Sequence, residues 1–282
     1  MSDIDDVVVA ANAIKDKTLK ANALALIEQM SFKLEDGDDK DSGYAPQFMR
    51  LIQGITAQDS YPDSARAGDF VLGSGKDAFV LARNSELLPI MMPSSRIFWD
   101  PAEKDKGKML CSSPDAVIGK LGPCDTCQHA KYVEGEGVDC TSVITMSAMT
   151  SDLSHIFRLG FSKTAWKVGK GLKDSMRRKS KQPYQVVVKL SSAMNSDHKQ
   201  VQAPSVEIVG TPPIEVQEFT RQVFLYFKKG RDAYIEVFRN ALPAPDATPL
   251  LQKPESAQVV SLTTTVDPDK SAVSPLATEY KF

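Results

Sequence analysis

Residues 141–179 read TSVITMSAMTSDLSHIFRLGFSKTAWKVGKGLKDSMRRK, and this stretch decides the expected fold. Residues 141–149 and 155–161 have the composition of strands, and the polar TSDLS segment between them predicts a turn. Ser162 can then cap a helix over residues 162–179. The apolar stripe of this helix consists of Ala165, Val168 or Gly169, Leu172 and Met176. A strand pair followed by a helix indicates antiparallel pairing with an accessory helix.

Similar patterns extend in both directions along the chain. Several short β-like segments, separated by Gly, Asp, Ser and Pro, lie between Met49 and Trp99. Two more strands are expected over residues 184–194 and 203–210, and a helix over residues 214–242 with a break near Gly230. Few parallel βαβ patterns occur. The sequence therefore predicts an α+β fold with a small antiparallel barrel or sheet and accessory helices.

We divide the chain into four parts. Residues 1–43 form an acidic arm that contains a helix over residues 17–34, with Leu19, Ala23, Leu26, Ile27 and Met30 on its apolar stripe. The other parts are a core over residues 44–210 with a cysteine-bearing insertion at 108–141, a helix over 211–242, and a disordered tail over 243–282.

The composition excludes several classes of protein. The chain has 282 residues, 34 basic and 36 acidic side chains and a net charge of −2. No run approaches the roughly 18 apolar residues of a membrane span, and acidic residues stand where an export signal needs basic ones. We therefore expect a cytoplasmic protein without membrane contact, and not a disulfide-stapled secreted domain.

The charge is unevenly distributed. Residues 1–41 contain ten acidic and five basic side chains, a net charge of −5. Residues 158–199 contain eleven basic and two acidic side chains, a net charge of +9. This contrast suits a polyanion-binding face, although a solvated basic helix would have the same composition. The acidic N-terminus is then a candidate autoinhibitory arm.

Aromatic residues are interleaved with the basic ones. Cations that follow a phosphate backbone, together with aromatic rings that stack on bases, are what single-strand binding requires. The candidate nucleic-acid-binding residues are Lys163, Trp166, Lys167, Lys170, Lys173, Arg177, Arg178, Lys181 and Tyr184. Phe157 and Phe161 have the same parity in a strand, which favours a position in the core for both.

The four cysteines give the sharpest chemical signal. Cys111, Cys124, Cys127 and Cys140 have the spacing C-x12-C-x2-C-x12-C. The C-x2-C pair can hold one side of a metal ion, Gly122 and Pro123 favour the tight turn before it, and the outer pair can complete a tetrahedron. We therefore expect a structural Zn²⁺ site that helps the insertion to fold.

Other chemistry remains open for these cysteines. An iron–sulfur cluster also uses four cysteines, and a redox C-x2-C motif would leave two of them idle. An open catalytic zinc would need an acid such as Glu134 or Glu136. His129 could substitute for a cysteine as a ligand, but with four cysteines present it is interpreted as a loop residue. No Ser/His/Asp set or carboxylate pair can be picked out, so we expect no enzymatic activity.

Several segments together resemble a family of phage-encoded proteins assigned to single-stranded DNA binding in replication or recombination. The segments are LIQGITAQ (51–58), ARAGDFVLGSG (65–75), LLPIMM (87–92), FWDP (98–101), LCSSPDAVIGKLGPCDTC (110–127) and FRLGFSKTAWKVGKGL (157–172). The four cysteines match the cysteine positions of that family, and Lys163, Thr164 and Leu172 match its helix start. The chain departs from the family pattern at Ser113–Pro114 and at Gln128.

The resemblance covers roughly residues 48–210 and implies an OB-like barrel in a viral DNA-metabolism protein, placed in the host cytoplasm. We expect a single-stranded DNA-binding protein whose partners are single-stranded DNA and replication or recombination proteins. The alternative is a zinc-containing protein-interaction module of a viral replication or transcription complex, which binds its partner through the helix face around Phe224, Phe227 and Tyr234.

Overall fold

The computed structural model of the chain describes residues 3–35, 46–54, 56, 61–100, 108–132, 138–194 and 201–242. The four α-helices in these ranges are α1 (Asp3–Asn12), α2 (Lys17–Glu35), α3 (Trp166–Arg178) and α4 (Ile214–Asn240). The strands are β1 (Met49–Leu51), β2 (Phe70–Leu72), β3 (Phe79–Leu81), β4 (Ser85–Met91), β5 (Ser94–Trp99), β6 (Met109–Ser113), β7 (Ile118–Gly119), β8 (Gly122–Pro123), β9 (Cys140–Thr150), β10 (Ile156–Ser162), β11 (Val187–Met194) and β12 (Gln202–Gly210). The pairs of these strands are antiparallel, which confirms the α+β class with antiparallel sheets.

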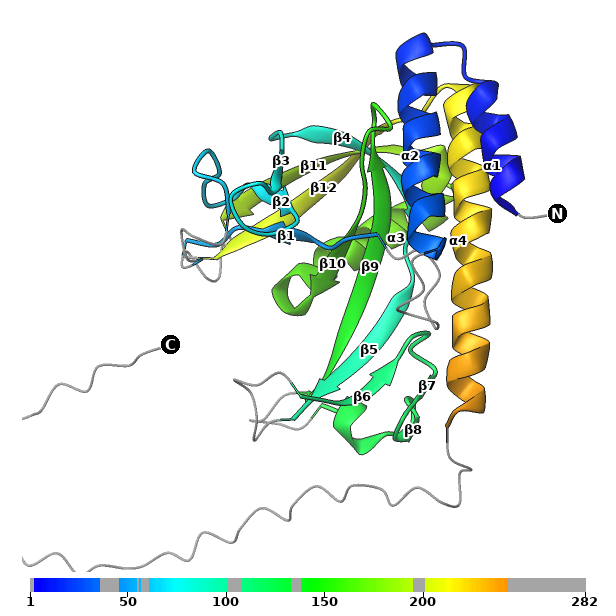
Figure 1. Cartoon of the computed structure of the whole chain (residues 1–282). Coiled ribbons are helices and arrows are strands. Elements are labelled where there is room, and N and C mark those ends of the chain that lie inside the picture. Colours follow the sequence, from blue (N-terminus) through cyan, green and yellow to red (C-terminus); the bar gives the residue numbers. More distant parts are fainter. Residues whose placement is uncertain are drawn as a thin grey trace, which may run out of the picture. The chain divides into compact units, whose positions relative to one another are not determined.

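The long strand β9 lies at the centre of a seven-stranded sheet (Figure 1). One of its edges pairs with β10, and its other edge pairs with β5 in its first half and with β4 in its second half. The sheet continues from β4 to β11 and β12, and from β5 to β6. The expected strand pair around the TSDLS turn is thus β9 and β10, in the register Phe157 opposite Ala148.

One core lies between β9, β10, the neighbouring strands and α3. Phe157 and Phe161 of β10 are fully buried in it, as their shared parity predicts. Helix α3 covers this core with Gly169, Leu172 and Met176, which confirms the predicted apolar stripe. Gly169 allows the close approach, because a Cβ atom there would lie 2.7 Å from Cβ of Phe161.

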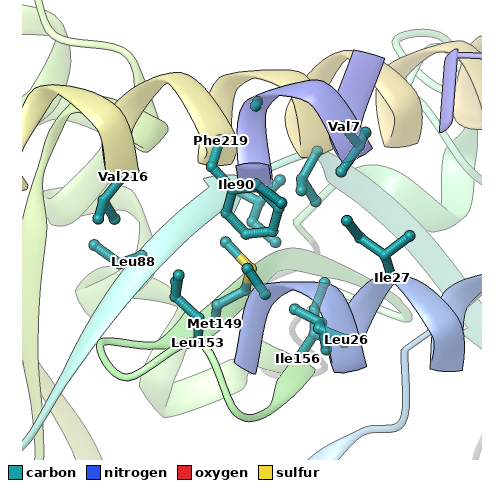
Figure 2. Packing of buried hydrophobic residues seen from close by; sticks show 14 of the residues in the cluster. Val7, Leu26, Ile27, Leu88, Ile90, Met149, Leu153, Ile156, Val216 and Phe219 are labelled. Carbon is teal, nitrogen blue, oxygen red and sulfur yellow. The ribbon is translucent and has the colours of Figure 1, made fainter. Parts of the chain in front are cut away.

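A second core lies on the other side of β4 and β9, where α1, α2 and α4 pack (Figure 2). Strand β4 contributes Leu88 and Ile90, and the end of β9 contributes Met149. The helices contribute fully buried residues, among them Val7, Leu26, Met30 and Phe219. Both faces of β4 are therefore buried, since Leu87 of the same strand lies in the first core.

The N-terminus differs from our expectation. The predicted helix over residues 17–34 is present as α2, but the preceding residues form a further helix, α1, and do not form a free acidic arm. Val7, Ala11 and Ile14 are buried, while the acidic residues Asp5 and Asp6 are exposed. Charge in this segment thus marks the solvent side of an amphipathic helix. The autoinhibitory role of residues 1–41 stays a prediction, although the described helices of this segment pack in the core.

Two smaller expectations are also corrected. Helix α4 continues through Gly230 without a break, and Ser162 makes no capping hydrogen bond with its side chain. A 3-10 turn, η4 (Lys163–Ala165), instead leads from β10 into α3. None of the described helices has the length and apolar character needed to cross a membrane. Residues 36–43 of the predicted arm and the predicted tail over residues 243–282 lie outside the described residues.

A smaller sheet of β1, β2 and β3 lies against the large one. Just before β1, Phe48 forms a parallel bridge with Arg158 of β10, and the Arg158 N–H donates to the Gln47 carbonyl at 2.9 Å. Just after β1, the Gln53 amide exchanges hydrogen bonds of 2.8 and 3.0 Å with the backbone of Gln202 on β12. The segment around β1 thus connects β10 with β12, two strands far apart in the sheet order.

The contact between α3 and β10 makes Gly169 a test of the first core. We expect Gly169→Ala to lower the free energy of unfolding by about 1–3 kcal/mol, because the added methyl group overlaps Phe161. The matched control is Gly171→Ala in the same helix, where nothing lies within 4 Å of a new Cβ atom. That change should stabilise the protein by up to about 1 kcal/mol. Urea unfolding measures both, and equal effects of the two changes would contradict the packing.

Candidate metal centre and nucleic-acid interface

The insertion expected at residues 108–141 contains β6, β7 and β8 and a 3-10 turn, η3 (Gln128–Ala130). Cys111 lies on β6, Cys124 directly follows β8, Cys127 directly precedes η3, and Cys140 begins β9. Gly122 has a positive φ of 106° at the β7–β8 turn, as expected for the tight turn before the C-x2-C pair. Gly119 lets β7 lie on β6, since a Cβ atom there would be 2.8 Å from the Cys111 sulfur.

All four cysteines line one small cavity of about 10 Å³. That volume suits a single water molecule or ion. The other lining residues are Arg96, Phe98, Ser113, Leu121, Gly122, His129 and Ala130. Cys124 and Cys140 are buried, Cys111 and Cys127 are half-buried, and the four are free cysteines. The cavity therefore gathers soft sulfur donors of the type that Zn²⁺ and iron–sulfur clusters prefer.

The cavity favours neutral thiols when no cation is present. Burial raises the pKa of Cys140 to about 11, although the Arg96 guanidinium opposes this and the other cysteines add to it. Burial also raises the pKa of Cys111, while the backbone N–H groups of Leu121 and Lys120 act in the opposite direction. A metal ion would have to displace these protons to bind thiolates, which couples metal binding to pH.

The sheet register explains why the four sulfurs do not meet at one point. Phe98 on β5 lies opposite Cys111 on β6 and also opposite Cys140 on β9, so the three side chains share one face. Neighbouring strands are about 4.7–4.9 Å apart, which places the outer cysteines two spacings apart with the Phe98 ring between them. Among the described residues no group of three or more His, Cys, Asp or Glu side chains has the arrangement of a metal site.

His129, which the sequence interpretation set aside as a loop residue, also lines this cavity. Its ring is buried, stacks on Phe98 with 4.3 Å between ring centroids, and has Nδ1 3.1 Å from Oδ2 of Asp139. Nε2 is buried and has no hydrogen-bond partner. The spacing C-x2-C-x-H made His129 a candidate ligand in the sequence, and the signal not used there is the acid ten residues later, Asp139.

The insertion is fastened to the end of α4 through Asp115. One oxygen of its carboxylate accepts hydrogen bonds from the N–H groups of Val117 and Ile118 and from the Ser113 hydroxyl, and the other pairs with the Arg239 guanidinium. Burial alone would raise the pKa of Asp115, but the hydrogen bonds and Arg239 outweigh it and hold the pKa below its ordinary value. The C-terminal half of α4 therefore depends on a charged Asp115.

The predicted basic residues form an outward stripe on α3 and its flanking turns. With about 100° between successive residues, Lys167, Lys170 and Arg177 lie opposite the buried Leu172 and Met176. Six of the predicted basic side chains are exposed: Lys163, Lys167, Lys170, Arg177, Arg178 and Lys181. Within the described ranges none of these six forms a salt bridge. We call this set the α3 basic stripe.

The other three predicted contacts lie beside the stripe. Trp166 is half-buried, packs against the first core and has the Lys170 ammonium 5.5 Å from its ring centroid. Lys173 turns toward β5 and donates to the Ser94 hydroxyl at 3.0 Å, and burial together with nearby Arg231 lowers its pKa. Tyr184 packs against Phe224 of α4 with 5.2 Å between ring centroids. Lys173 and Tyr184 are thus engaged in internal contacts.

The surface predicted for a protein partner is largely internal. Phe227 is buried and Phe224 packs against the helical core, while Tyr234 is 42 % exposed. Two of the three aromatic residues therefore hold α4 to its own domain.

The Asp115 contact predicts an acid-sensitive insertion. Its folded-state pKa is lowered, so its stabilisation is present above the unfolded value of about 3.9 and is lost as pH falls through the folded value. We expect Asp115→Asn to destabilise the protein by roughly 1–2 kcal/mol at pH 7 and to have little effect near pH 2. Urea unfolding at both pH values measures this, with exposed Asp77→Asn as the control. A constant difference at all pH values would contradict the role of the charge.

Comparison of the chain with protein-family models, with curated proteins and with solved structures finds no match.

Proposed function

We propose that this protein binds single-stranded DNA through the α3 basic stripe. The observation that carries the proposal is a row of exposed cations that form no salt bridge within the described ranges, opposite the side of α3 that is fixed on the core. A rigid helix presents these charges at a constant spacing, which suits a phosphate backbone. The phage-family resemblance of residues 48–210 supports a role in viral DNA replication or recombination, without enzymatic activity and in the host cytoplasm.

Trp166 gives the stripe its aromatic element. A half-buried ring that is fixed by the core on one side and flanked by Lys170 can stack on a base without losing much side-chain freedom. Stacking of this kind contributes about 1–3 kcal/mol per base and tolerates any sequence. We expect Lys173 and Tyr184 to contribute less to DNA binding, because each already has an internal partner.

An OB-like barrel is part of the proposal. It is supported by the order β12-β11-β4-β9 with β10 beside β9, and by the β1 segment that connects β10 with β12. The first core would fill such a barrel and α3 would cover one end of it. Small barrels of this type expose a strand face and loops to oligonucleotides.

A structural metal is the second part of the proposal. Support comes from the four thiols around one cavity of the size of an ion and from the soft donor chemistry of that set. When bound, zinc would cross-link β6, the β7–β8 hairpin and the start of β9. The link to β9 requires Cys140 as a ligand, and a site without Cys140 would join only β6, the β7–β8 hairpin and the start of η3. In either case zinc would have a structural role and no part in chemistry on DNA.

DNA binding is tested by removing three charges from the stripe. We expect Lys167→Gln, Lys170→Gln and Arg177→Gln together to weaken binding of a labelled 30-nucleotide single strand roughly tenfold or more at 50 mM salt. The slope of log K against log salt should fall by about 2, because single strands release about 0.7 counterions per phosphate contact. Fluorescence anisotropy at 50 and 200 mM salt measures both.

The matched control removes three exposed charges elsewhere, with Lys15→Gln, Lys17→Gln and Lys228→Gln. The control has the same net charge, so long-range attraction is equal in the two variants. Equal weakening in both variants would point to the net charge alone, and no binding by the metal-replete wild type would rule out the proposed function.

The metal is tested by analysis of protein purified under reducing conditions. We expect about one zinc per chain by mass spectrometry and no visible absorption band. Chelation should lower the melting temperature and expose the cysteines to thiol reagents. If the analysis finds iron and sulfide, the site holds an iron–sulfur cluster and not zinc. A metal content near zero would overturn this part of the proposal.

A further inference from the structure

His129 contains the one described buried side-chain atom without a hydrogen-bond partner, its ring nitrogen Nε2. A buried polar atom without a partner costs about 1–3 kcal/mol. Nearly all buried polar atoms in folded proteins have a hydrogen-bond partner, so this nitrogen needs an explanation. Nε2 lies in a residue that lines the cavity of the four cysteines, so the missing partner belongs to that cavity.

The ring of His129 is fixed in the orientation of a ligand. Nδ1 is 3.1 Å from the Asp139 carboxylate, and the neutral ring can donate its proton there and leave a lone pair on Nε2. Asp139 does not line the cavity, so the Nδ1 edge faces away from it and the Nε2 edge is left for the thiols. Stacking on Phe98 prevents the ring from turning. A histidine that binds metal through one nitrogen commonly donates the other N–H to a carboxylate.

The register of the sheet argues for the same assignment. Phe98 separates Cys111 from Cys140 by two strand spacings, roughly 9–10 Å, so both sulfurs reach a single ion only with difficulty. His129 lies over Phe98 and two residues after Cys127. The His129 ring can therefore take the place of one outer cysteine as a ligand of the metal ion. Of these two outer cysteines, Cys111 has its sulfur against Gly119, in the β7–β8 hairpin that leads directly to Cys124.

We infer that His129 is a metal ligand through Nε2, and that metal binding draws it together with Cys111, Cys124 and Cys127 into a Cys₃His site. Asp139 is then a positioning residue that holds the imidazole, and Cys140 lines the same cavity without binding the metal. Zinc is the expected metal, because a tetrahedral set of three sulfurs and one nitrogen is typical of its structural sites. The inference rests on the metal part of the proposed function and does not depend on DNA binding.

The test is X-ray absorption spectroscopy of the full-length protein loaded with one equivalent of zinc. We expect three sulfur neighbours at about 2.3 Å and one nitrogen neighbour at about 2.0–2.1 Å. Four sulfur neighbours would overturn the assignment of His129 and leave the zinc proposal intact. Failure of the wild type to bind zinc would overturn both.

Three variants identify the ligands individually. Cys140→Ser should keep the spectrum and the zinc affinity of the wild type, whereas His129→Gln should lose the nitrogen neighbour. Asp139→Asn should keep the neighbour set and weaken zinc binding roughly 10–100-fold in competition with a chelator. His155→Gln, at a histidine outside the cavity, is the control. Loss of zinc in Cys140→Ser together with normal binding in His129→Gln would overturn the inference.

Discussion

The burial of β9 and β4 from both sides is the constraint on which the rest of the molecule depends. Alternate residues of β9 point to opposite cores, so Met146 and Ala148 face the core under α3 while Met149 faces the helical core. A shift of one residue in the β9 register would exchange these two sets. The two cores therefore fix one register, and that register also sets the positions of Cys140, opposite Phe98, and of β10.

Much of the fold could be predicted because its strongest patterns are local. The strands around the TSDLS turn, the stripe of α3 and the helix over residues 17–34 each carry a clear period of two or 3.6 residues. Helix α1 was missed because Asp3, Asp5 and Asp6 gave its first turn the composition of a solvated arm. Only the packing of Val7 and Ala11 on α4 distinguishes the two interpretations, and that contact is not local.

At the candidate site, too, local sequence patterns predicted one part, whereas contacts between segments far apart in the chain decide the rest. Cysteine spacing predicted that the four thiols form one metal site. The four residues line one cavity, but in the part of the chain that the structure describes they are not arranged as a metal site. Spacing says nothing of Phe98, which comes from a strand that precedes the insertion and lies between the outer cysteines. On the basic stripe, charge predicted the exposed side chains, while the inward turn of Lys173 follows from the position of Ser94 on β5.

Helix α4 connects the helical core with the cysteine-bearing insertion. Its 27 residues span about 40 Å, with Phe219 and Val223 in the helical core and Arg231 and Arg239 on the insertion, where they contact Pro114 and Asp115. The last turns of the helix have little apolar burial of their own, so they are held mainly by polar contacts with the insertion. Local opening of the β7–β8 hairpin must therefore release those turns as well. We therefore expect the amides of the two segments to exchange as one cooperative unit, separate from the more protected central sheet.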